Sequence, residues 1–216
     1  MARIVFDLDG TLIDSAPDLR AVANEVLDGE GAEPVTLEDT YEFIGNGTPV
    51  FVARMRAARG IPDSEQDRLL AAFLDRYDGA VGLTRPYSGV VDALGKLFAD
   101  HALGICTNKP HGPALSVLNH FGLASYFSTV IGGDSLPEPK PDPAPLHAAF
   151  DALGAGPRLY VGDSEVDAET AERAGVAFLL HTGGYLKSRA EDVQHAAGFG
   201  RFADLPGIVE AALKRV

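Results

Sequence analysis

Residues 3–11 read RIVFDLDGT, an apolar run that leads directly into two aspartates and a glycine. The run up to Asp7 is predicted to form a buried strand, and side chains two residues apart in a strand point to the same face. Asp7 and Asp9 therefore set two carboxylates side by side, while Gly10 lets the backbone turn sharply beyond them. One carboxylate is able to attack phosphorus and the other to move a proton, so the stretch predicts phosphoryl chemistry; a solvated acidic turn is the alternative.

A calcium-binding loop also begins with Asp-x-Asp, but the rest of its pattern does not fit. Such a loop needs glycine at its sixth position and glutamate at its twelfth, and a helix before it. Counted from Asp7, those positions hold Leu12 and Asp18, and the preceding residues have the composition of a strand. We therefore exclude a calcium loop.

Four further apolar runs end in polar or glycine-rich residues, and amphipathic stretches lie between them. The predicted strands cover residues 103–107, 128–131, 158–162 and 177–181. The predicted helices cover residues 114–121, 145–153 and 165–174, with a closing helix over 204–216. This alternation predicts an α/β fold with a parallel sheet covered on both faces. Ligands of such sheets bind outside the carboxyl ends of the strands, where the polar residues of this chain gather.

The alternation stops between residues 15 and 83, where no strand pattern is convincing. Successive helices are predicted there over residues 17–27, 37–44, 49–59 and 64–81. Pro17 and Pro49 suit the first turns of two of these helices. We therefore expect two units: an α/β catalytic core domain of residues 1–14 and 85–216, and a helical cap domain of residues 15–84.

Two loops after predicted strands carry candidate phosphate ligands. Thr107 and Asn108 follow the second strand, where a hydroxyl and backbone amides could hold phosphate oxygens; an ordinary turn is the alternative. Lys140 opens the sequence Lys-Pro-Asp-Pro, whose prolines stiffen the backbone beside it. Its ammonium suits a phosphoryl group and a nucleophilic carboxylate equally, although a surface lysine in a proline-rich loop has the same appearance.

The fourth predicted strand runs into the stretch GDSEVD, which supplies candidate metal ligands. Asp163 stands at the strand end, opposite Asp7 in the expected sheet, and Asp167 lies one helical turn later. Magnesium favours a few carboxylates, a carbonyl and water oxygens. The carboxylates of Asp7 and Asp163 and the backbone carbonyl of Asp9 could supply that set, with Asp167 or Ser164 holding a water. Capping of the following helix by Asp163 or Ser164 is the alternative.

Taken in order, the motifs DLDGT, TNK, KPDP and GDSEVD resemble those of the haloacid dehalogenase superfamily, specifically of its phosphatases. The match spans nearly the whole chain, and the helical insert lies where that family has its first-type cap. The resemblance implies a Rossmann-like parallel-sheet core with an inserted all-helical cap. It also implies a Mg²⁺-dependent phosphatase that forms an aspartyl-phosphate.

The resemblance further assigns roles to individual residues. Asp7 is the implied nucleophile, Asp9 the general acid and base, and Lys140 the third catalytic group. The implied ligands of the substrate in the core are Thr11, Thr107 and Asn108, and those of the metal are Asp7, Asp9 and Asp163, with Asp167 in support. Dehalogenases of the superfamily lack an acidic residue at the position of Asp9. Sugar-phosphate mutases commonly carry a bulkier aliphatic residue at the position of Thr11.

Residues 43–47 of the insert, FIGNG, resemble the cap stretch of bacterial phosphoglycolate phosphatases. Gly45, Asn46 and Gly47 form a turn before a predicted helix, and amides at the start of a helix can bind a carboxylate. The resemblance therefore implies a small phosphate monoester as substrate, with 2-phosphoglycolate first among the candidates. An ordinary turn between helices is the alternative interpretation of these residues.

Other functions stay open at this point. A broad-specificity sugar-phosphate or nucleotide phosphatase would differ only in its cap contacts, and a phosphosugar mutase of the same fold would return the phosphoryl group to a sugar. A binding protein without catalysis would show a gap in the motifs, and the chain shows none.

Composition limits the possible partners. The chain has 216 residues and a net charge of −13, which argues against nucleic acid and anionic membrane surfaces as partners. Cys106 is the only cysteine, so no internal disulfide is possible, and its apolar surroundings favour a buried position. No stretch approaches the ~20 apolar residues of a membrane helix, and no signal peptide is recognisable. We expect a cytoplasmic monomer or homodimer whose partner is a small phosphorylated metabolite.

Overall fold

The computed structural model of the chain describes residues 1–215. A six-stranded sheet has the order β5-β4-β1-β6-β7-β8, and every neighbouring pair in it is parallel. Its strands are β1 (Arg3–Phe6), β4 (Ala102–Cys106), β5 (Thr129–Ile131), β6 (Arg158–Gly162), β7 (Ala177–His181) and β8 (Ala197–Phe199). The predicted α/β fold is confirmed. Strand β8 was not predicted, because three residues of mixed burial give no clear period.

The chain order of the strands places a binding position at the end of β1. This strand lies between β4 and β6, so the chain leaves it first toward one edge of the sheet and later toward the other. In sheets of this kind, ligands bind at the point where the strand order reverses. Phe6 is paired with Ile105 on one side and Val161 on the other, so residues just after all three strand ends lie close together.

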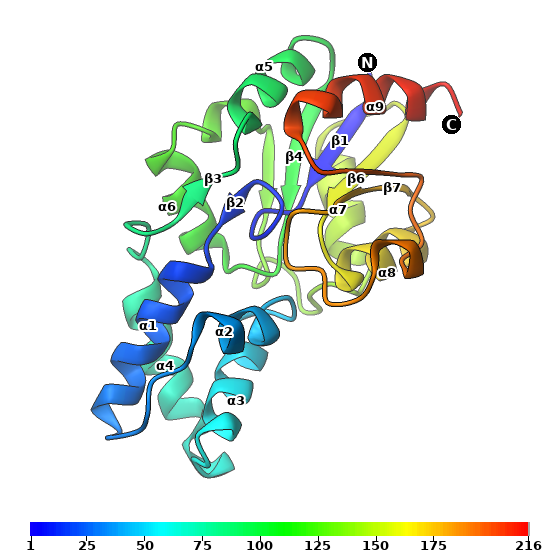
Figure 1. Cartoon of the computed structure of the whole chain (residues 1–216). Helices are drawn as coiled ribbons and strands as arrows, with labels where there is room; N and C mark the ends of the chain where they lie inside the picture. The colour runs from blue at the N-terminus through cyan, green and yellow to red at the C-terminus, as the bar shows by residue number, and fades with distance from the viewer. Residues whose placement is uncertain (216) are drawn as a thin grey trace.

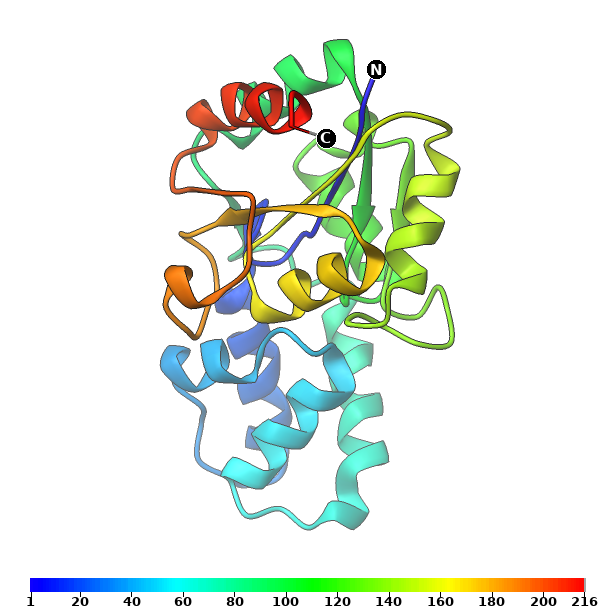
Figure 2. The ribbon, with the colours of Figure 1, turned by 90° about the vertical axis from the view of Figure 1, so that its right-hand side faces the viewer.

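Helices cover both faces of the sheet (Figures 1 and 2). On one face, helices α5 (Val90–Asp100), α6 (His111–His120) and α9 (Leu205–Leu213) share a buried cluster with Ile4 and Phe6. On the other face, α7 (Ala144–Ala152) and α8 (Glu165–Ala174) share a second cluster with Val5. Successive side chains of β1 thus point to opposite faces, as strand geometry requires.

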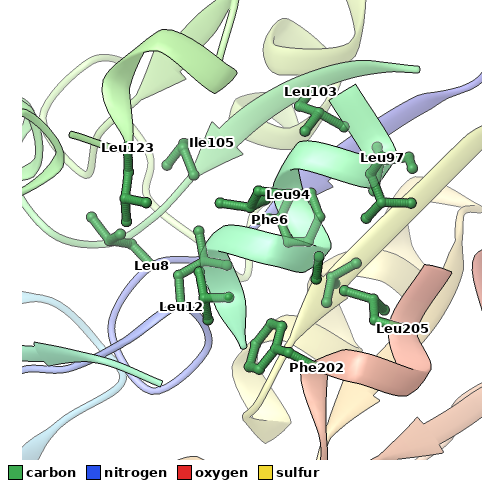
Figure 3. Packing of buried hydrophobic residues seen from close by; sticks show 14 of the residues in the cluster. Phe6, Leu8, Leu12, Leu94, Leu97, Leu103, Ile105, Leu123, Phe202 and Leu205 are labelled. Atoms are coloured by element: carbon green, nitrogen blue, oxygen red, sulfur yellow. The ribbon is translucent and has the colours of Figure 1, made fainter. Parts of the chain in front are cut away.

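The first of these clusters anchors the strand that carries the acidic motif. Phe6 lies among Leu94, Leu97 and Leu103, and all four side chains are buried (Figure 3). Each fully buried side chain of this size contributes roughly 1.5–3 kcal/mol to folding. The residue that follows Phe6 is therefore held at a fixed place at the end of the sheet.

The helical insert forms its own hydrophobic cluster at one end of the molecule (Figures 1 and 2). Its helices are α1 (Ala16–Gly29), α2 (Leu37–Phe43), α3 (Thr48–Ala58) and α4 (Gln66–Tyr77). The expectation of an all-helical insert is confirmed, but the predicted helix over 64–81 is too long. A 3₁₀ turn (Asp63–Glu65) precedes α4, which ends at Tyr77. Gly79 and Gly82 follow that end, and glycine disfavours helix.

A two-stranded antiparallel ribbon joins the insert to the sheet domain. It consists of β2 (Ile13–Asp14) and β3 (Arg85–Pro86), which are too short to show a period in the sequence. Next to it, the buried Asp18 carboxylate accepts hydrogen bonds from the amides of Leu83 and Thr84 and from the Thr84 hydroxyl. The two chain segments that enter and leave the insert are thus tied to each other.

Three smaller expectations can be compared with the structure. Helix α9 ends at Leu213, and residue 216 of the predicted closing helix lies outside the described residues. Cys106 is buried at the end of β4, as predicted. None of the helices in residues 1–215 combines the length and apolar character needed to cross a bilayer.

Candidate active site

A cavity of about 290 Å³ lies between the carboxyl ends of the central strands and the helical insert. Nine of the ten residues predicted for the site line it: Asp7, Asp9, Gly45, Asn46, Gly47, Thr107, Asn108, Lys140 and Asp163. These residues come from five separate parts of the sequence. The cavity is therefore built jointly by the sheet and the insert.

Thr11 is the exception among the predicted substrate ligands. It is fully buried, does not line the cavity, and donates its hydroxyl to Asp163 Oδ1 at 2.7 Å. The prediction of a direct substrate contact is therefore corrected to an orienting contact with Asp163. The reason is the sharp turn at Gly10, which has a φ of 85° and directs the following residue back under the sheet end.

Three buried carboxylates meet where β1 and β6 end. Asp7, Asp163 and Asp167 offer oxygen atoms that all lie within 4.8 Å of one another. Burial and the proximity of the other carboxylates raise the pKa of Asp7 to about 7, although Lys140 acts in the opposite direction. The same two causes raise the pKa of Asp163 well above its ordinary value. Ionised carboxylates this close need a positive counter-charge.

Hydrogen bonds distinguish Asp167 from the other two carboxylates. Asp167 Oδ1 accepts from Lys140 Nζ and the Tyr160 hydroxyl, each at 2.7 Å. Its Oδ2 accepts from the amides of Asp163 and Ser164 and from the Ser164 hydroxyl. Burial opposes ionisation of Asp167, but Lys140 and these donors lower its pKa below the ordinary value. With its oxygens occupied in this way, Asp167 orients its neighbours.

Asp7 and Asp163 keep capacity for a divalent metal ion. Asp7 accepts one hydrogen bond, from Lys140, and Asp163 accepts one on each oxygen, from Thr11 and from the Tyr185 amide at 2.6 Å. Each oxygen can accept a further interaction. Oxygen donors with this excess of negative charge fit a hard cation such as Mg²⁺. The backbone at Gly10 must approach closely, since a Cβ there would lie 2.2 Å from Asp163 Oδ2.

Lys140 connects the nucleophile candidate to Asp167. Its ammonium is buried and donates to Asp7 Oδ1 at 2.9 Å and to Asp167 Oδ1 at 2.7 Å. Burial alone would lower the pKa of Lys140, but the two carboxylates raise it above its ordinary value, so the group is charged. A fixed positive charge beside Asp7 suits an anionic phosphoryl group.

Asn108 has a structural part in this arrangement. Its side-chain amide donates to the carbonyls of Lys140 and Gly45, and its Oδ1 accepts from the Lys140 amide at 3.0 Å. Asn108 therefore holds the lysine loop and the glycine turn of the insert together. Thr107 lines the cavity, and its hydroxyl oxygen accepts from the Lys109 amide, which leaves its proton free to donate.

Sequence reasoning missed Lys109, which contacts Asp9, and Tyr77, which contacts Lys109. Lys109 Nζ donates to Asp9 Oδ1 at 3.1 Å and also to the hydroxyl of Tyr77, the last residue of α4. One oxygen of the Asp9 carboxylate thus faces an ammonium group. The motif TNK contains Lys109 and could have drawn attention to it, whereas nothing near Tyr77 in the sequence indicates this contact.

The opposite end of the cavity is formed by the glycine turn and two cations. Gly45 and Gly47 have φ values of 118° and 83°, which favour glycine, and α3 begins directly after the turn. Arg54 donates to Asn46 Oδ1 at 3.0 Å, and Lys187 donates to the Ile44 carbonyl at 3.1 Å. Both cations line the cavity. Lys187 was missed, because it lies in a loop after β7 that carries no motif.

Electrostatics makes this end of the cavity suitable for an anion. Burial and the nearby Arg54 guanidinium lower the pKa of Lys187. An anion bound between these two cations would relieve the repulsion between their positive charges. The amides at the start of α3 place the positive end of the helix dipole in the same region.

Comparisons with known proteins agree with this geometry. The family model described as haloacid dehalogenase-like hydrolase matches residues 4–181. A phosphoglycolate phosphatase of Cereibacter sphaeroides strain ATCC 17029 is 46% identical over 99% of this chain and 100% of that protein. A phosphoglycolate phosphatase of Rhodobacter capsulatus is 44% identical over 96% of each chain.

A solved structure extends the comparison to three dimensions. A crystal structure described as a predicted phosphoglycolate phosphatase from Haemophilus somnus 129pt superposes with a TM-score of 0.89 at 32% identity. The superposition covers 97% of this chain and 98% of that one, so it includes both the sheet and the helical insert.

Proposed function

Because the chain belongs to the haloacid dehalogenase-like hydrolase family, we propose that it is a Mg²⁺-dependent phosphatase that hydrolyses 2-phosphoglycolate. The observation that carries this proposal is the cavity with two different ends. At one end Asp7 and Lys140 face each other, and at the other the glycine turn lies beside Arg54 and Lys187. A short molecule with a phosphate and a carboxylate matches both ends.

The chemistry proposed for the chain's own groups has two steps. Asp7 forms a bond to phosphorus while the bond from phosphorus to the glycolate oxygen breaks, and Asp9 gives that oxygen a proton. Asp9 then takes a proton from a water molecule whose oxygen attacks the phosphorus, and the bond to Asp7 breaks to release phosphate. The oxygens of Asp7 and phosphate, ~4 Å apart, repel by about 4 kcal/mol at an effective dielectric near 20, which Lys140 helps to offset.

Mg²⁺ is proposed to bind the carboxylates of Asp7 and Asp163 and the backbone carbonyl of Asp9. When bound, it supplies positive charge that neutralises the carboxylates and the phosphoryl oxygens. The support is the raised pKa of both carboxylates and their free acceptor capacity. Thr11, Tyr185 and Asp167 hold the ligands in place.

Metal removal gives a test of this assignment. We expect EDTA to abolish turnover and Mg²⁺ to restore it, and we expect Mg²⁺ to raise the melting temperature more at pH 8 than at pH 5. The pKa of Asp7 is raised from 3.8 to about 7 in the folded, metal-free protein. Protonated Asp7 therefore favours the metal-free fold at low pH, and this stabilisation is lost as the pH rises through about 7. Metal binding needs the deprotonated form of Asp7. An equal Mg²⁺ shift at both pH values in a thermal melt would argue against Asp7 as a ligand.

The helical insert is proposed to act as a cap that selects the leaving group. The division predicted from the sequence, residues 15–84 against 1–14 and 85–216, is the working definition of this cap. The motifs of the sheet domain act on any phosphate monoester, so selection must come from the insert and the loops that touch it. Closure of such a unit also excludes bulk water from the phosphoryl group.

The ratio of kcat/KM for phosphoglycolate to that for ethyl phosphate tests the substrate directly. We expect a ratio of about 10²–10⁴ at saturating Mg²⁺, since two charge-assisted hydrogen bonds to the carboxylate contribute roughly 1.5–3 kcal/mol each. Arg54→Met should lower kcat/KM for phosphoglycolate and leave kcat/KM for ethyl phosphate unchanged, so the ratio should fall. Lys96→Met, an exposed lysine on α5, serves as a control that should change neither.

Outcomes of this assay also address the rival functions. A ratio near one would remove the carboxylate-binding role from the insert and favour a broad-specificity phosphatase. Conversion of a hexose phosphate into its isomer, detected by chromatography, would identify a phosphosugar mutase. The expected cytoplasmic location and the monomeric or dimeric state stay predictions.

A further inference from the structure

The carboxylate of Asp9 depends on a single partner for its orientation. Within residues 1–215, Lys109 Nζ provides the only hydrogen bond to the Asp9 side chain, at 3.1 Å. The same ammonium donates to the hydroxyl of Tyr77 and lies 4.3 Å from the centre of its ring. Lys109 is therefore placed between the proton-transferring carboxylate and a tyrosine.

Lys109 itself is held firmly by the sheet domain. Its amide donates to the Thr107 hydroxyl oxygen, and its carbonyl accepts from the Gly133 amide at 2.9 Å. The residue is only 7% exposed. Burial alone would lower its pKa, but the Asp9 carboxylate and the Tyr77 hydroxyl raise it above the ordinary value, so it carries a positive charge.

Tyr77 belongs to the other unit. It is the last residue of α4, and its ring packs in the hydrophobic cluster of the insert, 5.4 Å from the ring of Phe73. The contacts from Asp9 to Lys109 and from Lys109 to Tyr77 thus cross from the sheet domain to the insert. Movement of the insert away from the sheet would remove one of the two acceptors of Lys109.

We propose that Lys109 is the positioning residue for Asp9, and that Tyr77 completes this position only when the insert is seated on the sheet domain. Proton transfer is then tied to the closed arrangement, and a phosphoryl group exposed to bulk water meets a poorly aligned Asp9. This inference rests on the proposed phosphatase chemistry. It adds two residues that act through Asp9 and need not touch the substrate.

Substrates whose leaving groups differ in basicity distinguish a positioning role of Lys109 from a merely structural role. An alkoxide such as that of glycolate needs a proton from Asp9 to leave, whereas p-nitrophenolate leaves without one. Lys109→Met should slow the first turnover of phosphoglycolate by about 10²-fold, within the range that general acid catalysis contributes. The first turnover of p-nitrophenyl phosphate should change little.

The second chemical step gives a further signature. Hydrolysis of the aspartyl-phosphate needs Asp9 as a base whichever substrate formed it. Lys109→Met should therefore release one equivalent of p-nitrophenolate in a burst and then turn over slowly. The phosphorylated enzyme should accumulate, which mass spectrometry of acid-quenched samples detects. Tyr77→Phe keeps the ring and should show the same pattern in weaker form.

Controls make the outcome decisive. Lys96→Met should behave as the parent protein, and thermal melts establish that each variant is folded. Equal slowing of both substrates in the first turnover, with weaker inhibition by inorganic phosphate, would overturn the proposal and make Lys109 a phosphate ligand. Unchanged kinetics in Lys109→Met would overturn it as well. If the parent protein shows no preference for phosphoglycolate, the proposed substrate is wrong but the role of Lys109 can still be tested. Ethyl phosphate, whose leaving group also needs a proton, then replaces phosphoglycolate in the comparison with p-nitrophenyl phosphate.

Discussion

Asp7→Asn is expected to lower turnover of phosphoglycolate by at least about 10⁴-fold, as removal of a covalent nucleophile does in other hydrolases. The neutral amide cannot form the acyl phosphate on which both steps depend. The measurement is the steady-state rate at saturating Mg²⁺, together with acid-quenched mass spectrometry to show that no phosphorylated enzyme forms. Substantial activity in a sample verified to contain asparagine would reject the covalent mechanism.

The same substitution should not harm the fold. Burial raises the pKa of Asp7 to about 7, so the ionised carboxylate destabilises the metal-free protein above that pH. Asparagine mimics the protonated form, and we expect a melting temperature equal to or above that of the parent protein at pH 8 in EDTA. Asp28→Asn, an exposed aspartate of α1, is the matched control and should leave both activity and melting temperature unchanged.

Lys140→Met is expected to reduce both activity and stability. The substitution leaves Asp7 and Asp167 buried without their shared counter-charge, and loss of one partner of a buried ion pair costs about 3–5 kcal/mol. Turnover should fall by roughly 10²–10³-fold, because a fixed charge aimed at the reacting phosphoryl group is lost. Thermal melts and kcat with phosphoglycolate measure the two effects.

The pH dependence distinguishes this explanation from simple loss of packing. Protonation of the unpaired carboxylates at low pH removes their repulsion, so the stability deficit of Lys140→Met should be smaller at pH 5 than at pH 8. Methionine has nearly the length of lysine and fills the same space. A deficit of the same size at both pH values would indicate a packing defect. Lys96→Met again supplies the control on an exposed position.

Much of the site was accessible from the sequence because its residues follow strand ends. Asp7, Thr107 and Asp163 each stand directly after an apolar run, and parallel strands bring their carboxyl ends to one edge. The spacing of apolar residues also identified the helices of the insert, since each helix buries one face. The weak points were elements of two or three residues, such as β2, β3 and β8, in which no period can be detected.

Only the tertiary structure decided which side chains finally meet. Thr11 moved from substrate ligand to partner of Asp163, because a turn after a strand can direct a side chain to either side. Tyr77 and Lys187 reach the cavity from positions with no local signal, since long side chains on separate elements converge through packing.

The sequence by itself determined the α/β fold, the helical insert and the set of charged residues at the strand ends. The role of each charged residue depended on distances across the fold. These distances decide whether a buried carboxylate lies beside an ammonium, an amide or another carboxylate. Asp167 and Asp163 look alike in the sequence, four residues apart. In the structure Asp167 is occupied by Lys140, Tyr160 and Ser164, while Asp163 keeps acceptor capacity for a cation.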